Sequence, residues 1–213
     1  MIPKLRFSDR REAGRALAPR VLEFSSPPSV VLGIPRGGVE VAEHIAKLLG
    51  APLAPVWVKK LYAPGMPDVV LGAVDLDGDV TLSPELALAE GLTDDQIAEI
   101  AFHGHEILLQ EWERGPGLDA SALLAGATAI IVDDCITTGL TLRAAMRWAR
   151  RQFVRKVILA LPVVDRRIWH RVAGDADQSV TLEERDDGPL ARSEIYEHYQ
   201  RVSPDAMADL LGS

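Results

Sequence analysis

The chain has 213 residues, of which 47% are hydrophobic and 25% are charged, a composition typical of a globular protein with a substantial core. Its 23 lysines and arginines against 31 acidic residues give a net charge of −8. This disfavours nucleic acid as a partner, because such binding neutralises phosphates. The single cysteine excludes an intrachain disulfide and a cysteine-based metal cluster. No apolar run reaches the roughly 18 residues of a membrane span, and the first residues lack a signal-peptide core. We therefore expect a cytoplasmic protein without membrane contact, and a homo-oligomer stays open.

Short apolar runs along the chain predict strands. In chain order they are residues 29–34, 53–58, 71–76, 79–82, 127–132, 157–161 and 179–182. Apolar residues at helical spacing predict helices between most of these strands. They lie at about residues 9–24, 41–49, 94–114, 140–149 and 166–172, with further helical segments near the carboxyl end. This alternation predicts an α/β fold with a parallel sheet flanked by helices.

The region between the predicted strands 53–58 and 127–132 interrupts the alternation of strands and helices. Asp77-Gly78 is a strong turn dipeptide that joins two of the short strands into a hairpin. The long helix over 94–114 follows it. We therefore expect a single domain over residues 1–213 with an inserted hairpin and helix at about 62–117, which forms a small hood.

Three polar segments follow strands of the predicted sheet. They are Pro35-Arg36-Gly37-Gly38, Lys59-Lys60 and the segment 133–141. Open parallel sheets bind their ligands at the carboxyl ends of the strands. The fold is therefore expected to bring these three segments, distant in sequence, to one edge of the sheet.

The segment after the predicted strand 127–132 combines two kinds of ligand-binding group. Asp133 and Asp134 leave a buried strand, where ionised groups need partners, and carboxylates can accept hydrogen bonds from the vicinal hydroxyls of a ribose. Thr137-Thr138-Gly139-Leu140-Thr141 then opens a helix, whose free N–H groups and dipole favour a phosphate. The pattern predicts a site for ribose 5-phosphate. The alternative is a helix cap followed by turn threonines.

The segment from Ile130 to Thr141 resembles the ribose-phosphate loop of type I phosphoribosyltransferases, in which apolar residues precede two acids, a Thr-Gly pair and a further threonine. The resemblance implies that family's parallel sheet with a small hood, and binding of 5-phosphoribosyl-1-pyrophosphate (PRPP). It also implies that Asp133 and Asp134 hold the ribose hydroxyls. The residues implied around the 5-phosphate are Cys135, Ile136, Thr137, Thr138, Gly139, Leu140 and Thr141.

Other segments extend the resemblance over nearly the whole chain to a bacterial subgroup of predicted phosphoribosyltransferases. They are Pro35-Arg36-Gly37-Gly38, Lys60-Leu61, Leu71-Gly72-Ala73-Val74 and residues 196–211. The subgroup usually carries glycine, alanine, glutamate and tryptophan where this chain has Cys135, Thr137, Asp68 and Ile195, respectively.

The glycine-rich turn is assigned to the pyrophosphate. Gly37 and Gly38 allow backbone N–H groups to approach an anion, and Arg36 supplies a fork of donors. A plain turn with a solvated arginine is the alternative. Lys59 and Lys60 would add positive charge at the same edge, although a lysine at a strand end is more often simply solvated.

The resemblance implies transfer of ribose 5-phosphate from PRPP to a nitrogenous base or similar acceptor, with release of pyrophosphate, as a step of nucleotide metabolism. Mg²⁺, held mainly through PRPP and water, would neutralise the pyrophosphate. Asp133, Asp134, Arg36 and Lys60 are the expected catalytic residues. Because Thr137 stands where the hypoxanthine-guanine branch has an aspartate, an acceptor that is already anionic or otherwise activated is easier to accommodate. A non-catalytic PRPP sensor is the main alternative, and a hydrolase is a third.

Two local features lead to structural predictions. Related folds commonly place a non-proline cis peptide bond in the pyrophosphate loop, so we expect one between Pro35 and Arg36 and a trans bond before Pro35. Cys135 lies in an anion-binding loop near a helix N-terminus, which predicts a lowered thiol pKa and a reactive, ligand-protected thiol without a catalytic role.

Other polar clusters are given structural roles. His103 and His105 stand two positions apart on a helix and point in different directions, so they cannot share a metal ion. The segment 75–79 has its glycine at the wrong position for a calcium loop and predicts a hairpin turn. Tyr196 and Tyr199 could stack on a nucleobase, but packing is the favoured interpretation.

Overall fold

Five parallel strands form the central sheet, in the spatial order β2-β1-β6-β7-β8. The computed structural model describes residues 4–115, 118–186, 188, 190–200 and 202–212. The parallel sheet predicted from the sequence is confirmed. Its strands are β1 (Ser29–Gly33), β2 (Leu53–Pro55), β6 (Thr128–Val132), β7 (Lys156–Asp165) and β8 (Gln178–Arg185).

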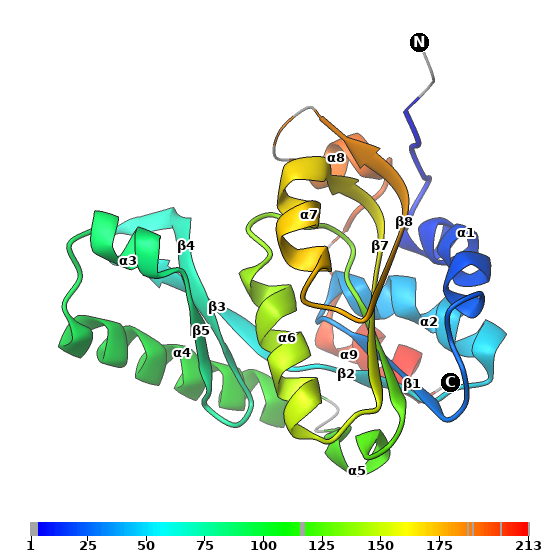
Figure 1. The fold of residues 1–213 in the computed structure, drawn as a ribbon, viewed down its shortest axis with the longest axis horizontal. Helices are drawn as coiled ribbons and strands as arrows, with labels where there is room; N and C mark the ends of the chain where they lie inside the picture. Colours follow the sequence, from blue (N-terminus) through cyan, green and yellow to red (C-terminus); the bar gives the residue numbers. More distant parts are fainter. Residues whose placement is uncertain (1–3, 116–117, 187, 189, 201, 213) are drawn as a thin grey trace.

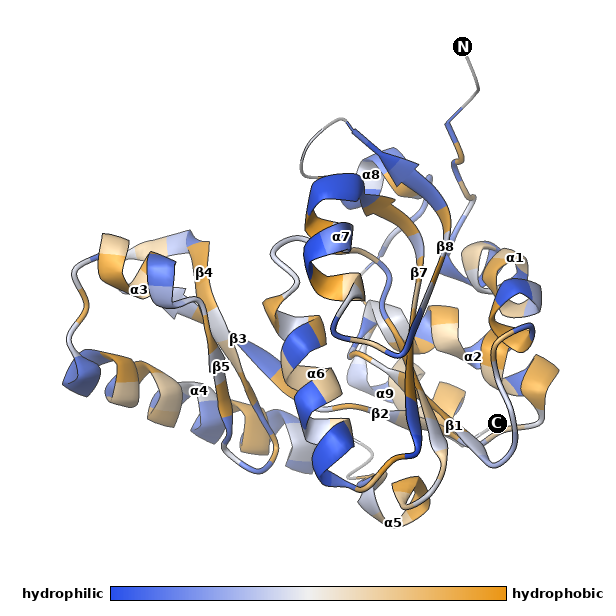
Figure 2. Cartoon of the chain, in the orientation of Figure 1, coloured by the Kyte–Doolittle hydropathy of each residue, from blue (hydrophilic) through white to orange (hydrophobic). Residues whose placement is uncertain are grey.

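Helices cover both faces of this sheet, with α6 and α7 in front and α2 behind in the view of Figure 1. Strand residues that point to the front, such as Ile131, pack with Met146 of α6 in one buried cluster. Their neighbours that point back, such as Ile130, pack with Ile45 of α2 in another. Figure 2 shows the apolar residues of β7 in orange and both polar and apolar residues along α7. The helices are α1 (Arg10–Leu22), α2 (Gly37–Leu49), α5 (Ser121–Leu124), α6 (Leu140–Arg151) and α7 (Arg166–Ala173).

The insertion forms a second, antiparallel sheet that extends away from the central one (Figure 1). Its elements are β3 (Val58–Ala63), β4 (Met66–Asp75), β5 (Val80–Leu82), α3 (Pro84–Ala89) and α4 (Asp94–Arg114). The predicted hairpin and long helix are both present. Thr93 and Gln96 form a capping box that fixes the start of α4. The insertion begins at Val58 rather than at residue 62, and the end expected at residue 117 lies outside the described residues.

The strand predicted over residues 53–58, which is β2, is shorter than predicted. It ends at Pro55 because its partner β1 ends at Gly33, the residue opposite Pro55, and the last bond of the ladder runs from the Val56 N–H to the Gly33 carbonyl oxygen at 3.0 Å. Lys59 and Lys60 therefore do not stand at the end of this strand. They lie in β3, opposite Val74 and Ala73 of β4, so the insertion, and not the central sheet, carries both lysines.

β7 is longer than predicted because it continues through Pro162. β6 pairs with β7 only as far as Ala160. Beyond that residue β7 has β8 as its neighbour, and Leu161 and Val163 keep that pairing on either side of the proline. A proline is tolerated where one side of the strand carries no partner.

The carboxyl-terminal segment packs against both the core and the insertion. It contains α8 (Arg192–Ile195) and α9 (Pro204–Leu211). Met207 of α9 shares a buried cluster with Val39 of α2 and Leu108 of α4. Within the described ranges, no helix is both long and apolar enough to span a bilayer.

Candidate active site

The site lies at the point where the chain leaves two neighbouring strands in opposite directions. β1 and β6 are adjacent, but β2 follows β1 on one side and β7 follows β6 on the other. Loops diverge at such a switch point and leave a crevice. Here a cavity of about 520 Å³ opens between them, a size typical of small-molecule sites.

Most of the predicted site residues line this cavity. They are Arg36, Gly37, Lys59, Lys60, Asp133, Asp134, Cys135, Ile136, Thr137, Gly139 and Thr141. Gly38, Thr138 and Leu140, which the structure also describes, do not line it. Gly38 lies behind the loop, where an added Cβ would sit 2.5 Å from the carbonyl oxygen of Val132. Because Gly38 has no side chain, α2 can lie close to β6.

The Pro35–Arg36 peptide bond is cis, as predicted, and Pro27–Pro28 is a second cis bond that we did not anticipate. The loop passes directly over the acid pair. A Cβ at Gly37 would collide with the Asp134 carboxylate, so the loop after β1 and the loop after β6 are in contact through this glycine.

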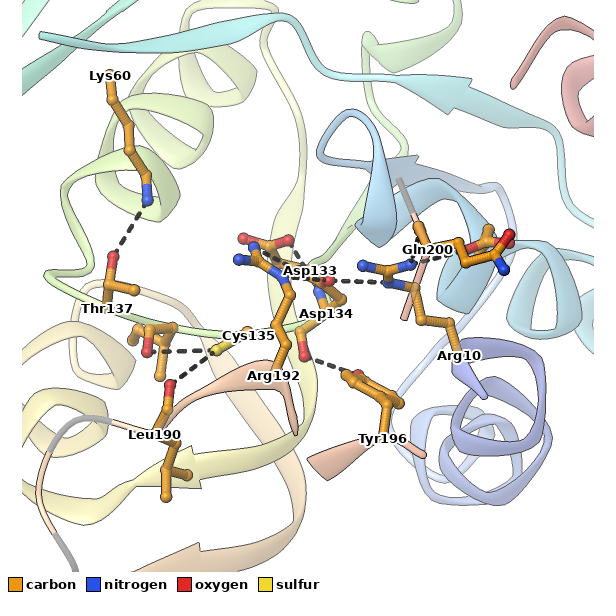
Figure 3. A network of polar contacts seen from close by, with 12 residues as sticks. Arg10, Lys60, Asp133, Asp134, Cys135, Thr137, Leu190, Arg192, Tyr196 and Gln200 are labelled. Carbon is orange, nitrogen blue, oxygen red and sulfur yellow. Dashed lines mark hydrogen bonds and ion pairs between the residues drawn. The ribbon is translucent and has the colours of Figure 1, made fainter. Parts of the chain in front are cut away.

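The two acids have different surroundings (Figure 3). Asp134 is 1% exposed, and its Oδ2 accepts hydrogen bonds from Arg10 Nε and Arg192 Nε, both at 2.8 Å. Burial alone would raise the pKa of Asp134, but Arg192 and Arg10 outweigh it and hold this pKa below its ordinary value. Burial and the adjacent Asp134 charge raise the pKa of Asp133 well above its ordinary range.

The two lysines of β3 face the cavity with different partners. Lys60 Nζ donates to Thr137 Oγ1 at 3.2 Å, which joins the insertion to the threonine loop. Lys59 Nζ forms an ion pair of 2.8 Å with Glu111 of α4. Lys60 is thus the lysine that reaches the predicted phosphate loop.

The threonine loop ends at Gly139, whose φ of 82° is in the left-handed region that favours glycine. α6 begins directly after it, and Gly139, Thr141 and Leu142 line the cavity at this point. A side chain at this position would also collide with Val172 of α7. Glycine is therefore required twice over at the start of this helix.

Residues 10–187 match the family model of the phosphoribosyl transferase domain. The chain belongs to this family. Two proteins of Mycobacterium tuberculosis, each named "Putative phosphoribosyl transferase", are 39% identical to it over 181 residues, which is 83% of this chain and 40% of theirs. The chain thus spans about 40% of the length of these curated relatives. The crystal structure of TT1426 from Thermus thermophilus is 32% identical, with a TM-score of 0.81 over 97% of this chain and 98% of that one.

The cavity is also lined by two arginines that were not predicted from the sequence. Arg10 and Arg192 are 124 and 58 positions away from Asp134 along the chain. Arg10 lies in the charged run 9–12, where it is indistinguishable from its neighbour Arg11. No local signal marks either arginine, because only the fold brings them to the acid.

The donor set fits a magnesium ion that is held by its ligand rather than by the protein. Among the described residues there is no group of three or more histidine, cysteine or acidic side chains that could hold a metal ion. Glu111 is paired with Lys59, and Asp134 is paired with two arginines. Mg²⁺ commonly keeps several waters and binds through substrate phosphates, which agrees with such a site.

The prediction of a reactive Cys135 is wrong. Burial, the largest cause, raises the pKa of this thiol from 9.0 to about 12, and the neighbouring Asp134 charge adds to the shift. The thiol is 6% exposed and donates to the carbonyl oxygen of Leu190 at 3.5 Å. The prediction considered the helix N-terminus but not the packing of Leu190 and its neighbours over the sulfur.

The two tyrosines differ. Tyr196 is fully buried, its hydroxyl donates to the Asp134 carbonyl at 2.7 Å, and Arg10 lies over its ring at 5.7 Å. The packing interpretation is confirmed for this residue. Tyr199 is 45% exposed and lines the cavity.

Proposed function

We propose that the protein transfers ribose 5-phosphate from PRPP to a nitrogenous base or similar acceptor and releases pyrophosphate. The observation that carries this proposal is the meeting of two loops at one cavity, the cis Pro35–Arg36 loop after β1 and the acid-threonine loop after β6. Membership of the phosphoribosyl transferase domain family supports the general reaction.

In this proposal, each part of PRPP is matched to lining residues whose chemistry suits it. The 5-phosphate lies at the start of α6, where backbone N–H groups of the first turn and the hydroxyls of Thr137 and Thr141 can donate to it. The ribose lies at the acid pair. The pyrophosphate lies at the Pro35–Arg36–Gly37 loop, with Arg36 and Lys60 as cationic partners. All of these residues line the same cavity.

The reaction breaks the bond between the anomeric carbon and the pyrophosphate oxygen, and the electron pair leaves with pyrophosphate. The acceptor nitrogen forms the new bond to that carbon. Arg36 and Lys60 stabilise the charge that develops on the leaving group, while the loop that carries the acid pair and the threonines holds the ribose 5-phosphate, so that positioning and electrostatics carry the catalysis. When bound, Mg²⁺ supplies further charge neutralisation at the pyrophosphate.

The acceptor side of the cavity lacks an obvious general base among the described residues. Thr137 cannot remove a proton at neutral pH, and Glu111 is paired with Lys59 at 2.8 Å. An acceptor that is already anionic, or otherwise activated, fits this arrangement best. The same lack of a base is the observation that keeps a PRPP sensor as the second candidate.

A screen of nucleobases and related heterocycles against PRPP and Mg²⁺ tests the proposal. We expect release of pyrophosphate only when a particular acceptor is added, together with a product whose mass equals that of the acceptor plus ribose phosphate. Release without any acceptor would instead identify a hydrolase. Saturable binding of PRPP with no release under any condition would replace the transferase by the sensor.

A further inference from the structure

The carboxylate of Asp134 is nearly saturated by protein donors. A carboxylate offers about four lone-pair sites. Arg10 Nε and Arg192 Nε occupy Oδ2 at 2.8 Å each, and Arg192 Nη2 occupies Oδ1 at 3.1 Å. With the residue 1% exposed, little capacity is left for a ligand hydroxyl.

Asp133 differs from Asp134 in this respect. Its Oδ1 accepts a hydrogen bond of 2.8 Å from the backbone N–H of Asp134. No hydrogen bond from the described residues reaches its Oδ2, although Asp133 lines the cavity. Asp133 therefore keeps an acceptor oxygen for a ribose hydroxyl.

The arginines on Asp134 connect it to both ends of the chain. Arg10 is the first residue of α1, and Arg192 is the first residue of α8. Arg10 Nη1 also donates to the carbonyl oxygen of Gln200 at 2.8 Å, and the hydroxyl of Tyr196 donates to the carbonyl oxygen of Asp134 at 2.7 Å. Figure 3 shows these contacts converging on Asp134. The tail that carries Tyr199 to the cavity is thus attached to this acid, in addition to its backbone hydrogen bonds with Phe7 and Ser8.

We propose that the two acids have separate tasks: Asp133 contacts the ribose, while Asp134 is an anchor through which Arg10 and Arg192 position the tail 190–200 along the cavity. Arg10 and Arg192 are therefore positioning residues. Arg192 lies beyond residue 187, where the family match ends. The division of tasks rests on the proposed function, but the anchoring of the tail is measurable without any ligand.

Electrostatics explains why the anchor needs both arginines. The charged and titratable groups around Asp134 are Arg10, Arg192, Asp133, Cys135 and Tyr196, and Glu40 shares Arg10 through an ion pair of 3.2 Å. Of these groups, only the two arginines favour ionised Asp134. Loss of Arg192 would let the acid pair bind a proton at a higher pH than in the wild type.

The first test measures amide hydrogen exchange across residues 190–200 without ligand. We expect Asp134→Asn and Arg192→Ala to speed exchange at least about 10-fold there, because they release the contacts that fasten this segment. Asp133→Asn should leave it unchanged, and so should Arg11→Ala, the matched control on the exposed neighbour of Arg10. Equal protection in all four variants would overturn the anchoring role.

The second test measures PRPP affinity against pH by calorimetry with Mg²⁺. Asp133→Asn should weaken binding at least about 10-fold. In Arg192→Ala, the pH below which binding is lost should rise by about one unit, and Arg192→Lys should restore it because the charge returns. An unshifted pH profile in Arg192→Ala, or wild-type affinity in Asp133→Asn, would contradict the separate tasks. Absence of PRPP binding in the wild type would overturn the proposed function, and the exchange result would still decide the anchor.

Discussion

At the scale of single residues, burial outweighs local charge at Cys135. The start of α6 lies a few residues away, and its field alone would stabilise a thiolate. Removing the thiolate from water costs more, so the pKa of the thiol rises from 9.0 to about 12. The cysteine is therefore part of the packing that supports the acid pair, in one cluster with Ile195 and Tyr196.

Alkylation rates check this reversal. A pKa of about 12 instead of 9.0 lowers the thiolate fraction about 1,000-fold at pH 8, so iodoacetamide should label native Cys135 at least about 100-fold more slowly than the urea-unfolded chain. Because the folded pKa is the higher one, the stability linked to this thiol is present below pH 9 and is lost as the pH rises toward 12. Labelling of the native protein at the unfolded rate would show that the thiol is accessible.

The residues of the threonine loop could be predicted from the sequence because their chemistry is local. One loop between a strand and a helix is predicted by two acids, a Thr-Gly pair and a further threonine within nine positions. Arg10 and Arg192 could not be predicted in this way. Their partner Asp134 is far away along the chain, and an arginine that pairs with a buried acid looks in sequence like any exposed arginine.

At the scale of elements, Arg151 near the end of α6 holds the hairpin of the insertion. It forms ion pairs with Asp75 at 2.8 Å, Asp77 at 3.1 Å and Asp79 at 2.9 Å. Asp75 is 1% exposed, and its burial raises its pKa although Arg151 opposes the shift. The acids of the turn that resembles part of a calcium loop thus bind the guanidinium of Arg151. This contact joins the insertion to the central sheet and its helices.

Arg151→Ala should therefore lower the free energy of unfolding by about 2 kcal/mol, because it leaves Asp75 buried without its charged partner. Arg150→Ala is the matched control, since Arg150 pairs with the exposed Asp177 at 3.3 Å and such pairs contribute about 0–1 kcal/mol. Urea unfolding measures both. Equal losses in the two variants would show that the insertion does not depend on this contact.

The approach of α2 to the end of β6 depends on Gly38. An added Cβ would lie 2.5 Å from the carbonyl oxygen of Val132 and 3.0 Å from Cα of Asp133, and neither backbone atom can move freely. We expect Gly38→Ala to lower the free energy of unfolding by about 1–3 kcal/mol and to weaken PRPP binding by displacing the acid pair. Gly174→Ala is the control, because nothing lies within 4 Å of its added Cβ. Unfolding curves that are the same for both variants would contradict this close approach.

The placement of Lys59 and Lys60 shows what an apolar run leaves undetermined. The run 53–58 looks like one strand, yet Pro55 ends β2 and Val58 begins β3 of the other sheet. Periodicity identifies a run as extended, but the partner strand decides to which sheet it belongs. In contrast, the bounds of α4 agree with the prediction, since Thr93 and Gln96 mark its start locally.

At the scale of the whole molecule, the cavity and the surface differ in charge. The chain carries a net charge of −8, but among the described residues five cationic side chains against three acids line the cavity. The cations are Arg10, Arg36, Lys59, Lys60 and Arg192, and the acids are Glu111, Asp133 and Asp134. A cavity of this kind can attract a compact polyanion even though the net charge of the chain is negative. This local field agrees with PRPP as the ligand.

Calorimetric titration of PRPP with Mg²⁺ into the wild type and into Asp133→Asn/Asp134→Asn tests the central claim most directly. The double variant loses the ribose acceptor of Asp133 and also the anchor that Asp134 gives to the tail along the cavity, so it should bind at least about 100-fold more weakly. Asp94→Asn/Asp95→Asn makes the same two substitutions in an exposed acid pair at the start of α4 and should bind like the wild type. Unchanged affinity in a folded Asp133→Asn/Asp134→Asn protein would contradict the assignment of this cavity to PRPP.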